Sequence, residues 1–210
     1  MRCTAGLKEK VLFVHHRIDI SNILVAVLVT VLGVAVPNLF HVLGLGAMFL
    51  PMYLPLAAGA FMLSRKNALM AGVCTPLISA GLTGMPPFYP PIAFMMMVQL
   101  GFLCLYLSSA AHSPWNRNVH LSPVRILAIL IPGLLLERGL LFLLYSVVLP
   151  LFGVQAALFS IYDILRGLPG IFLLCAVVPF AVPRCVAILS KYSLRLYEDK
   201  DIKGHEIGNQ

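Results

Sequence analysis

Residues 124–149 read VRILAILIPGLLLERGLLFLLYSVVL, and this stretch decides which class of protein the chain belongs to. It is long enough to cross the hydrocarbon core of a bilayer, roughly 30 Å thick, with some tilt. Ser122 and Pro123 precede it. Ser favours the N-cap, and Pro fits the first helical position, where its missing N–H costs nothing. The stretch therefore predicts a membrane-spanning helix with a defined start.

Five more apolar stretches have the same character. The six predicted spans are residues 20–36, 42–63, 68–82, 91–111, 124–149 and 168–189. Hydrophobic residues make up 60% of the 210 residues and charged residues only 11%, which is too little charge for a soluble protein of this length. Because lipid offers backbone groups no partner outside their own helix, we predict an all-α integral membrane protein with six transmembrane helices. We expect one domain over 1–210, made of a cytoplasmic segment 1–19, a bundle 20–189 and a polar cytoplasmic tail 190–210.

The distribution of basic residues predicts the orientation of the bundle. Of the 15 Lys and Arg residues, all except Arg138 and Arg166 fall on one side of the membrane once the spans are marked. Basic residues resist translocation, so that side is predicted to be cytoplasmic, with both termini inside. The net charge of +7 follows from this bias, with some attraction to anionic lipid heads, and does not indicate nucleic-acid binding. The first span is expected to stay uncleaved, because Val36-Pro37 offers no signal-peptidase site.

The sequence contains no motif typical of catalysis, nucleotide binding or metal binding. The 5 cysteines form no CxxC pair, and the 6 histidines show no HExxH or Cys/His ligand spacing. A Gly-x-Ser-x-Gly elbow and a phosphate-binding glycine loop are also missing. We therefore expect no enzymatic activity, no ATP hydrolysis by the chain itself, no cofactor and no metal site.

Prolines interrupt the second and third spans at Pro51, Pro55 and Pro76. A proline inside a helix frees a carbonyl, which must find another partner in hydrocarbon. Short or proline-interrupted spans are a pointer to the binding region of transporters. Kinking for close packing is an equally good interpretation of any one of them.

The predicted outer loop between the third and fourth spans reads GMPPFYPP over residues 84–91. Its prolines fix φ, so the loop is stiff and loses little entropy when a ligand binds beneath it. Phe88 and Tyr89 offer ring faces, which predicts an aromatic lid over a flat heterocyclic ligand. The alternative is a pair of interfacial aromatic residues at a tight turn.

A second outer loop also carries a pattern typical of local structure. Ser160-x-x-Asp163 is similar to a capping box and predicts a short helix up to Arg166. Asp163 and Arg166 would share one side of that helix. They either neutralise one another or clamp a ligand.

Glu137 and Arg138 lie in the middle of the fifth span, where a charge costs about 2.5–3.5 kcal/mol on insertion scales. Neighbouring side chains on a helix point about 100° apart. We therefore expect that the side chains of Glu137 and Arg138 cannot simply bridge to one another. Each is expected to reach a partner on another helix or in a water-filled cavity. Gln99 in the fourth span is the nearest candidate by depth. A ligand contact and a buried structural network both remain open.

The first span carries small residues at Ala26 and Thr30, with Gly33 beyond. Small residues at this spacing allow another helix to approach closely. The approaching helix belongs either to this chain or to another subunit, and the spacing does not decide between the two.

The run FLPMYLPLAAGAFML…GVCTPLISAGLTGMPPFYPPIAF, with GLPGIFLLCAVVPFAV farther downstream, resembles the S components of energy-coupling factor (ECF) transporters. The resemblance covers residues 37 to about 185, and the GMPPFYPP loop and the GLPG start of the sixth span are its most specific parts. Those proteins are small six-helix membrane subunits with both termini inside, in agreement with the charge distribution here. Family members often carry Ala-x-x-x-Ala in the first span, and Ala26-x-x-x-Thr30 departs from that pattern.

The resemblance implies a substrate-capturing subunit for a vitamin or similar small heterocyclic micronutrient, in the plasma membrane of a prokaryote. It also implies partners, namely a transmembrane coupling protein and two ATPase subunits, on which the loaded subunit topples to deliver its ligand. In that family the ligand lies on the extracellular side, enclosed by the outer loops. The substrate-binding residues expected here are His41, Tyr53, Met85, Phe88, Tyr89, Gln99, Glu137, Arg138, Asp163 and Arg166. The residues expected to dock on the coupling protein are Ala26, Thr30 and Gly33.

Two other classes of membrane protein fit the topology. A stand-alone small-molecule channel or secondary carrier would need to dimerise at this length, and the sequence shows no inverted repeat. A membrane assembly subunit needs only packing surfaces, and would leave the proline-aromatic loop unexplained. The substrate, the choice of coupling module and the oligomeric state do not follow from the sequence.

Overall fold

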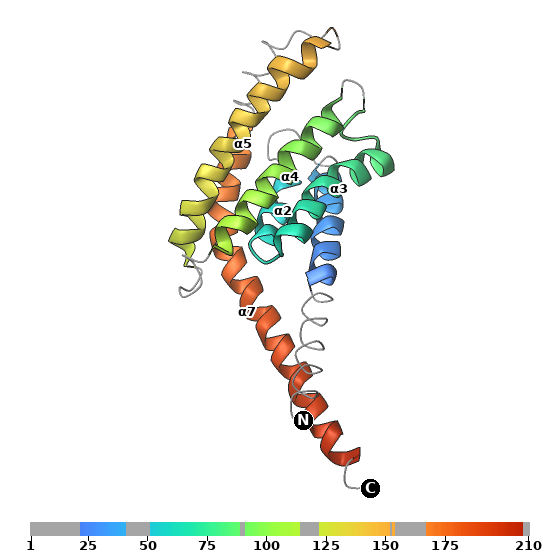
Figure 1. Cartoon of the computed structure of the whole chain (residues 1–210), viewed down its shortest axis with the longest axis vertical. Coiled ribbons are helices and arrows are strands. Elements are labelled where there is room, and N and C mark those ends of the chain that lie inside the picture. The colour runs from blue at the N-terminus through green and yellow to red at the C-terminus, as the bar shows by residue number, and fades with distance from the viewer. Residues whose placement is uncertain are drawn as a thin grey trace, which may run out of the picture.

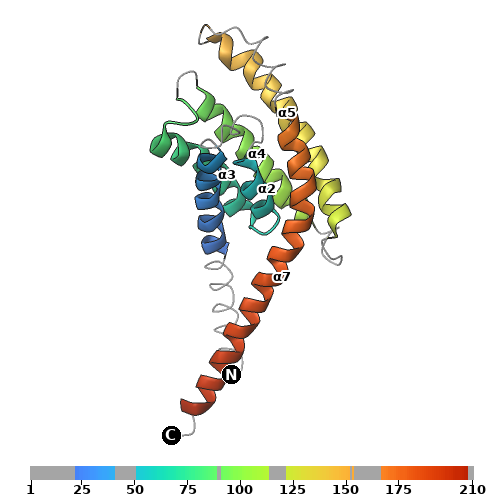
Figure 2. The ribbon, with the colours of Figure 1, turned by 180° about the vertical axis from the view of Figure 1, so that it is seen from behind.

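The structure, a computed structural model, describes residues 22–40, 51–88, 91–113, 122–151, 153 and 167–207. These residues form six helices and no strand. The helices are Asn22–Phe40, α2 (Tyr53–Ala60), α3 (Arg65–Thr83), α4 (Ile92–Ala111), α5 (Pro123–Leu151) and α7 (Leu168–Ile207). The described part of the chain is therefore all-α, as predicted. Figures 1 and 2 show that α3, α4, α5 and α7 run in alternating directions through the bundle.

Four of the described helices are long and apolar enough to cross a membrane: Asn22–Phe40, Ile92–Ala111, Pro123–Val147 and Leu168–Ile188. Their outward surfaces carry large, exposed hydrophobic side chains, including Leu24, Leu143 and Phe172. Such a surface suits lipid rather than water, so these helices indicate a membrane protein. Because α2 and α3 are not among the four, a bundle of six complete membrane spans stays a prediction.

The second predicted span, 42–63, differs from the helix that the structure describes. Residues 41–50 lie outside the described residues, and α2 ends at Ala60. Two backbone N–H groups of the turn that follows donate to the carbonyl of Gly59, at 2.9 and 3.0 Å. Because these two hydrogen bonds share one carbonyl acceptor, the chain tightens into a turn and the helix ends before residue 63.

The third predicted span, 68–82, is present as the longer helix α3. Ser64 is extended, with a ψ of 154°, and its carbonyl accepts the N–H of Ala68 at 2.8 Å. The helix therefore begins at Arg65 rather than at residue 68. It runs through Pro76 without ending, so that proline is accommodated within the helix.

The fifth and sixth predicted spans begin where the sequence places them, at Pro123 and Leu168. The carbonyl of Ser122 accepts the first hydrogen bonds of α5, as an N-cap residue should. However, α7 continues to Ile207 instead of ending near residue 189. No proline follows Pro183 to break it, and helix-favouring Leu, Lys, Arg and Glu residues continue the helix.

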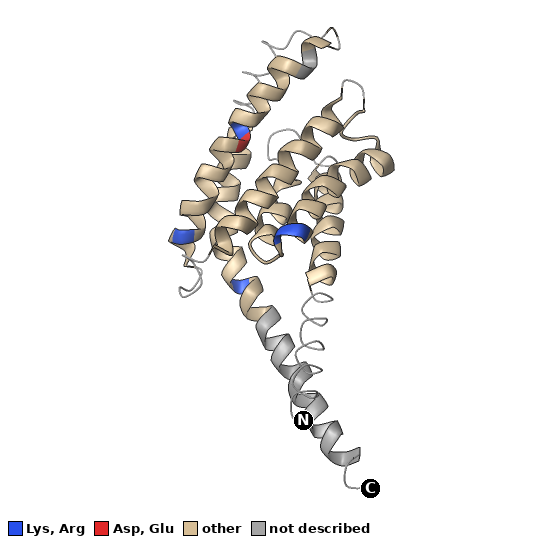
Figure 3. Ribbon diagram, viewed as in Figure 1, with Lys and Arg blue, Asp and Glu red and all other residues tan. Residues whose placement is uncertain are grey.

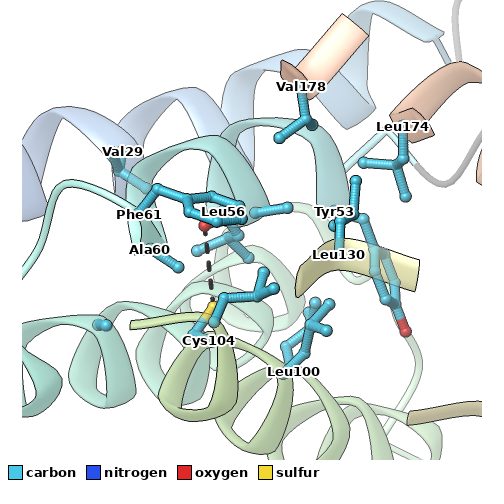
Figure 4. Packing of buried hydrophobic residues seen from close by; sticks show 14 of the residues in the cluster. Val29, Tyr53, Leu56, Ala60, Phe61, Leu100, Cys104, Leu130, Leu174 and Val178 are labelled. Atoms are coloured by element: carbon cyan, nitrogen blue, oxygen red, sulfur yellow. Dashed lines mark hydrogen bonds between the residues drawn. The ribbon is translucent and has the colours of Figure 1, made fainter. Parts of the chain in front are cut away.

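The short helix α2 lies at the centre of the hydrophobic core, surrounded by side chains from α4, α5, α7 and the helix 22–40 (Figure 4). The members with at most 1% exposure are Leu56, Ala57, Ala60, Leu63, Ala68, Leu100, Leu103, Cys104, Leu107, Ile126, Leu130, Leu174, Val178 and Val182. The Cys104 thiol faces the carbonyl of Leu56 at 3.9 Å. In lipid, van der Waals contact between such core side chains, rather than the hydrophobic effect, holds helices together.

Glycines bring α3 and α4 into backbone contact. A Cβ on Gly72 of α3 would lie 2.6 Å from the carbonyl oxygen of Leu100 and 2.9 Å from the Cα of Gly101, both in α4. No side chain fits at that distance, so only glycine permits this crossing. Gly72 therefore allows the backbones of α3 and α4 to touch at this crossing.

The helix 22–40 also packs closely, and its small residues face the protein's own bundle. A Cβ on Gly33 would lie 2.6 Å from Cγ2 of Thr75 in α3, and Ala26 packs against the hydrophobic core. The prediction of a close helix approach is confirmed for Gly33. The prediction that Ala26, Thr30 and Gly33 form a docking surface stays a prediction; Val29, on the same face as Gly33, is buried in the protein's own bundle.

The described basic side chains gather toward one end of the bundle. In Figure 3 the blue segments at the starts of α3 and α5, and the blue segment of α7, lie toward the same end. These segments hold Arg65, Lys66, Arg125 and Arg184. Arg138 is the exception, beside the red segment halfway along α5.

Candidate functional site

Three helices bring four polar side chains together inside the bundle. Tyr53 is the first residue of α2, Gln99 belongs to α4, and Glu137 and Arg138 lie near the middle of the 29-residue α5. Tyr53 and Gln99 are each 2% exposed, and Glu137 is 0% exposed. We call these four residues the polar cluster.

The carboxylate of Glu137 holds the polar cluster together. The hydroxyl of Tyr53 donates to Glu137 Oε1 at 2.9 Å, and Gln99 Nε2 donates to the same oxygen. Hydrogen bonds to an ionised group are roughly twice as strong as neutral ones. The pairing of Gln99 with this charged position is therefore confirmed, and it joins α4 to α5.

Arg138 turns back toward its neighbour. Its Nε lies 3.0 Å from Glu137 Oε2, and its guanidinium carbon lies 5.6 Å from the centre of the Tyr53 ring. The expectation that Glu137 and Arg138 cannot bridge was wrong. The 100° between neighbours fixes only where the side chains start, and the long, flexible arginine stem folds back across the helix surface.

Hydrogen-bonding capacity remains unused in this pair. Although Glu137 Oε2 and Arg138 Nε are close, their geometry is not that of a hydrogen bond, and both atoms are buried without a hydrogen-bond partner among the described residues. The same is true of Arg138 Nη2. A buried polar atom left unpaired costs about 1–3 kcal/mol, and more when it is charged. The polar cluster is therefore incomplete as a hydrogen-bond network.

The surroundings of the polar cluster are apolar and its charges cancel. Figure 4 shows Tyr53 at the edge of the core, with its hydroxyl pointing away from the hydrophobic residues. On the next turns of α5, Leu141 and Tyr145 form a small second cluster with Met95 of α4. Among the described residues from 22 to 188, Glu137 is the sole acidic residue, and Arg138 balances it.

The loop between α3 and α4 is fixed by hydrogen bonds to the helix that precedes it. α3 ends at Gly84, whose φ of 70° is the left-handed conformation that favours glycine. The carbonyl of Met85 then accepts the hydroxyl of Ser79 at 2.8 Å and that of Thr83 at 3.2 Å. On the other side, the carbonyl of Pro87 accepts the N–H of Ala93 at 3.2 Å. These bonds, together with the prolines, hold the loop against both helix ends.

The aromatic residue of this loop that the structure describes, Phe88, is 49% exposed. Its ring centre lies 6.0 Å from that of Phe94 in the first turn of α4, with the two ring planes 55° apart. This tilted geometry is a favourable arrangement for an aromatic pair. Phe88 therefore has a structural partner as well as a free ring face, and its role as a lid over a ligand stays a prediction.

The predicted substrate-binding residues fall into three groups. The structure brings together Tyr53, Gln99, Glu137 and Arg138. It places Met85 and Phe88 on the α3–α4 loop. The remaining four, His41, Tyr89, Asp163 and Arg166, lie outside the described residues. Contact between any of these side chains and a ligand stays a prediction.

Sequence analysis missed one residue that shapes this region, Ser79. It is buried in α3, and its hydroxyl fixes the carbonyl of Met85. Its position one turn before the end of the third span, next to the proline-rich loop, was the available signal. Its partner lies only six residues away, but the bond forms only because the chain reverses at Gly84.

Other groups in the described residues offer no further chemical site. Cys74, Cys104, Cys175 and Cys185 are free thiols, and no three His, Cys, Asp or Glu side chains in the described ranges gather as a metal site would require. In comparisons with known proteins, no family model, no curated protein and no solved structure matches the chain.

Proposed function

We propose that this protein is the substrate-capturing S component of an ECF-type importer for a vitamin or similar small heterocyclic micronutrient. One observation supports the proposal most strongly: in the middle of a membrane helix, Glu137 and its ion-pair partner Arg138 keep buried polar atoms that make no hydrogen bond with any described residue. Charge at this depth is expensive, and a purely structural network gains nothing from unpaired atoms. A ligand that forms the missing hydrogen bonds would offset the cost of burying the polar cluster.

The basic end of the bundle supports an orientation. Arg65, Lys66, Arg125 and Arg184 lie toward one end, and the α3–α4 loop begins at the far end of α3 (Figure 3). Under the positive-inside rule the basic end is cytoplasmic. The loop with Phe88 then lies on the extracellular side of a prokaryotic plasma membrane, where the ligand arrives, and both termini are inside.

The proposed transport cycle is the one that the resemblance to ECF S components implies. The ligand enters from outside, the outer loops close over it, and the polar cluster supplies its polar contacts. The loaded subunit then topples on a transmembrane coupling protein, driven by two ATPase subunits. The broad apolar surface of the described long helices suits rotation in lipid, since it presents few groups that would resist movement through the hydrocarbon.

One observation favours a different class of protein, a membrane assembly subunit. The bonds from Tyr53 and Gln99 to Glu137 join α2, α4 and α5, so the polar cluster has a structural role whether or not a ligand binds. A stand-alone channel or secondary carrier is the third possibility. The three differ in what the isolated protein does.

Ligand binding and uptake separate the three classes. The full chain, purified in detergent, is screened against a panel of vitamins by thermal unfolding. A ligand at 100 times its Kd should stabilise the protein by about 2.7 kcal/mol. Uptake of the bound vitamin is then measured in cells with and without a coupling protein and its ATPases. Uptake that requires this module supports an S component, and uptake by the chain alone indicates a carrier. A folded protein that binds no vitamin and transports none is an assembly subunit.

A further inference from the structure

Two adjacent groups of the polar cluster retain hydrogen-bonding atoms. Oε1 of Glu137 already accepts from Tyr53 and Gln99, whereas Oε2 accepts no hydrogen bond. Nε and Nη2 of Arg138 donate none within the described part of the chain. Oε2 and Nε form an ion pair at 3.0 Å without a hydrogen bond between them, so an acceptor and two donors that still have hydrogen-bonding capacity lie side by side.

A ligand that satisfies both groups must present the complementary pattern. An ionised carboxylate only accepts hydrogen bonds, and a guanidinium only donates them. The ligand therefore needs an N–H or O–H for Glu137 Oε2 and, attached to the same carbon, an acceptor for Arg138. The edges of aminopyrimidine, pyridone and lactam rings carry this pair of groups side by side.

The charges of the polar cluster limit the charge of the ligand. Glu137 and Arg138 cancel, and the other basic side chains that the structure describes lie toward the end of the bundle (Figure 3). A carboxylate ligand would lie beside Glu137, and an ammonium ligand beside Arg138. Either one adds an uncompensated charge to an apolar environment in which charges interact strongly.

We propose that the ligand of the polar cluster is an uncharged ring compound whose hydrogen-bond donor and acceptor are attached side by side to one shared carbon, with the donor bound by Glu137 and the acceptor by Arg138. This assignment rests on the proposed capture function. It makes the two charged residues specificity determinants rather than a salt bridge that only stabilises the bundle.

Matched probes test the assignment on the full-length protein in detergent. 1-Methylcytosine and 2-pyridone carry the proposed edge, and their methylated counterparts 1,N4,N4-trimethylcytosine and 1-methyl-2-pyridone have lost its donor. Nicotinate and N-methylpyridinium carry a negative and a positive charge. The tightest binder should be one of the two uncharged probes with an intact edge, and methylation should weaken its binding at least tenfold. This comparison uses the wild-type protein alone, so it does not depend on whether any variant folds.

Variants identify which residues bind the donor and the acceptor of the ring edge. Glu137→Gln should reduce the effect of methylation to less than threefold, whereas Arg138→Gln should weaken binding of both members of a pair. Ser108→Ala is the control, because it also removes a buried hydrogen bond of α4, the 2.8 Å bond to the carbonyl of Leu63, but lies outside the polar cluster.

The outcomes distinguish this assignment from the capture function itself. Tightest binding of a charged probe, or affinities that neither methylation nor Glu137→Gln changes, would overturn the assignment and leave capture intact. So would binding of a vitamin from the panel when none of the six probes binds. If neither vitamins nor probes bind to the folded protein, the capture function is wrong, and the assignment is wrong with it.

Discussion

Tyr53 and Glu137 are 84 positions apart in the sequence, and the hydroxyl of Tyr53 donates to Oε1 of Glu137 at 2.9 Å. This bond ties the short central helix α2 to α5, one of the long apolar helices. It also places an aromatic ring beneath the guanidinium of Arg138, 5.6 Å from its centre. One tyrosine therefore supports both charges of the pair, by a hydrogen bond to the anion and by its ring face to the cation.

Replacing Tyr53 by Phe should destabilise the protein while keeping the ring. The lost bond leaves Glu137 Oε1 with Gln99 as its only described donor, and hydrogen bonds to charged groups contribute about 1.5–3 kcal/mol. The Tm of the purified protein should fall accordingly. Tyr106→Phe in α4 removes a hydroxyl from a tyrosine that is only partly buried, and should change the Tm much less. Equal effects of the two substitutions would show that the Tyr53 bond contributes nothing specific.

Replacing Gly72 by Ala should disrupt the contact between α3 and α4. The added Cβ would lie 2.6 Å from the carbonyl oxygen of Leu100, which is backbone and cannot move aside without shifting α4. Overpacking of this kind costs about 1–3 kcal/mol, measured as a lower Tm and a smaller folded fraction. In the same helix, a Cβ on Gly81 meets nothing within 4 Å. Gly81→Ala should therefore be neutral, or stabilise by up to about 1 kcal/mol through helix propensity.

The predicted orientation can be tested by chemical labelling. In a variant without native cysteines, a cysteine introduced at Phe88 should react with a membrane-impermeant reagent applied to intact cells, because Phe88 is exposed on the α3–α4 loop. A cysteine introduced at Lys66, at the basic end, should react only after the cells are opened. A reporter fused after Gln210 should be active in the cytoplasm. Labelling of the Phe88 position only from inside would reverse the predicted orientation.

The double replacement of Phe88 and Tyr89 by Ala tests the aromatic lid. Loss of the ring contacts should weaken binding of the vitamin identified in the screen by roughly 1–3 kcal/mol, the scale of a buried aromatic contact. Expression should change little, since the loop backbone stays bound to Ser79 and Thr83. Phe94→Leu removes the partner ring of Phe88 but keeps an apolar side chain in α4. It should affect binding less, and unchanged affinity in the double variant would return the loop to the interfacial-belt interpretation.

The sequence by itself determined the all-α architecture and the positions of the long apolar helices. Residues 124–149 and 168–189 are predominantly apolar over more than the thickness of the hydrocarbon core, and this property needs no tertiary information. Local chemistry also fixed the start of α5, because Ser122 and Pro123 act only on the turn that they begin. The sequence likewise indicated Gln99 as the partner of the charged pair, because depth in the membrane follows from position along a span.

Only the tertiary structure decided how the helices use these residues. The spacing of Ala26 and Gly33 predicts that another helix approaches, but the identity of that helix depends on where the chain folds back, and it is α3 that lies against Gly33. The contact between Glu137 and Arg138 depends on how a long, flexible side chain turns in three dimensions, which the helical spacing of 100° does not fix. The position of Tyr53 beside both charges depends on the burial of a helix only 8 residues long at the centre of the bundle. Spacing in a sequence fixes directions within one helix, whereas contacts between helices are set by the packing of the whole chain.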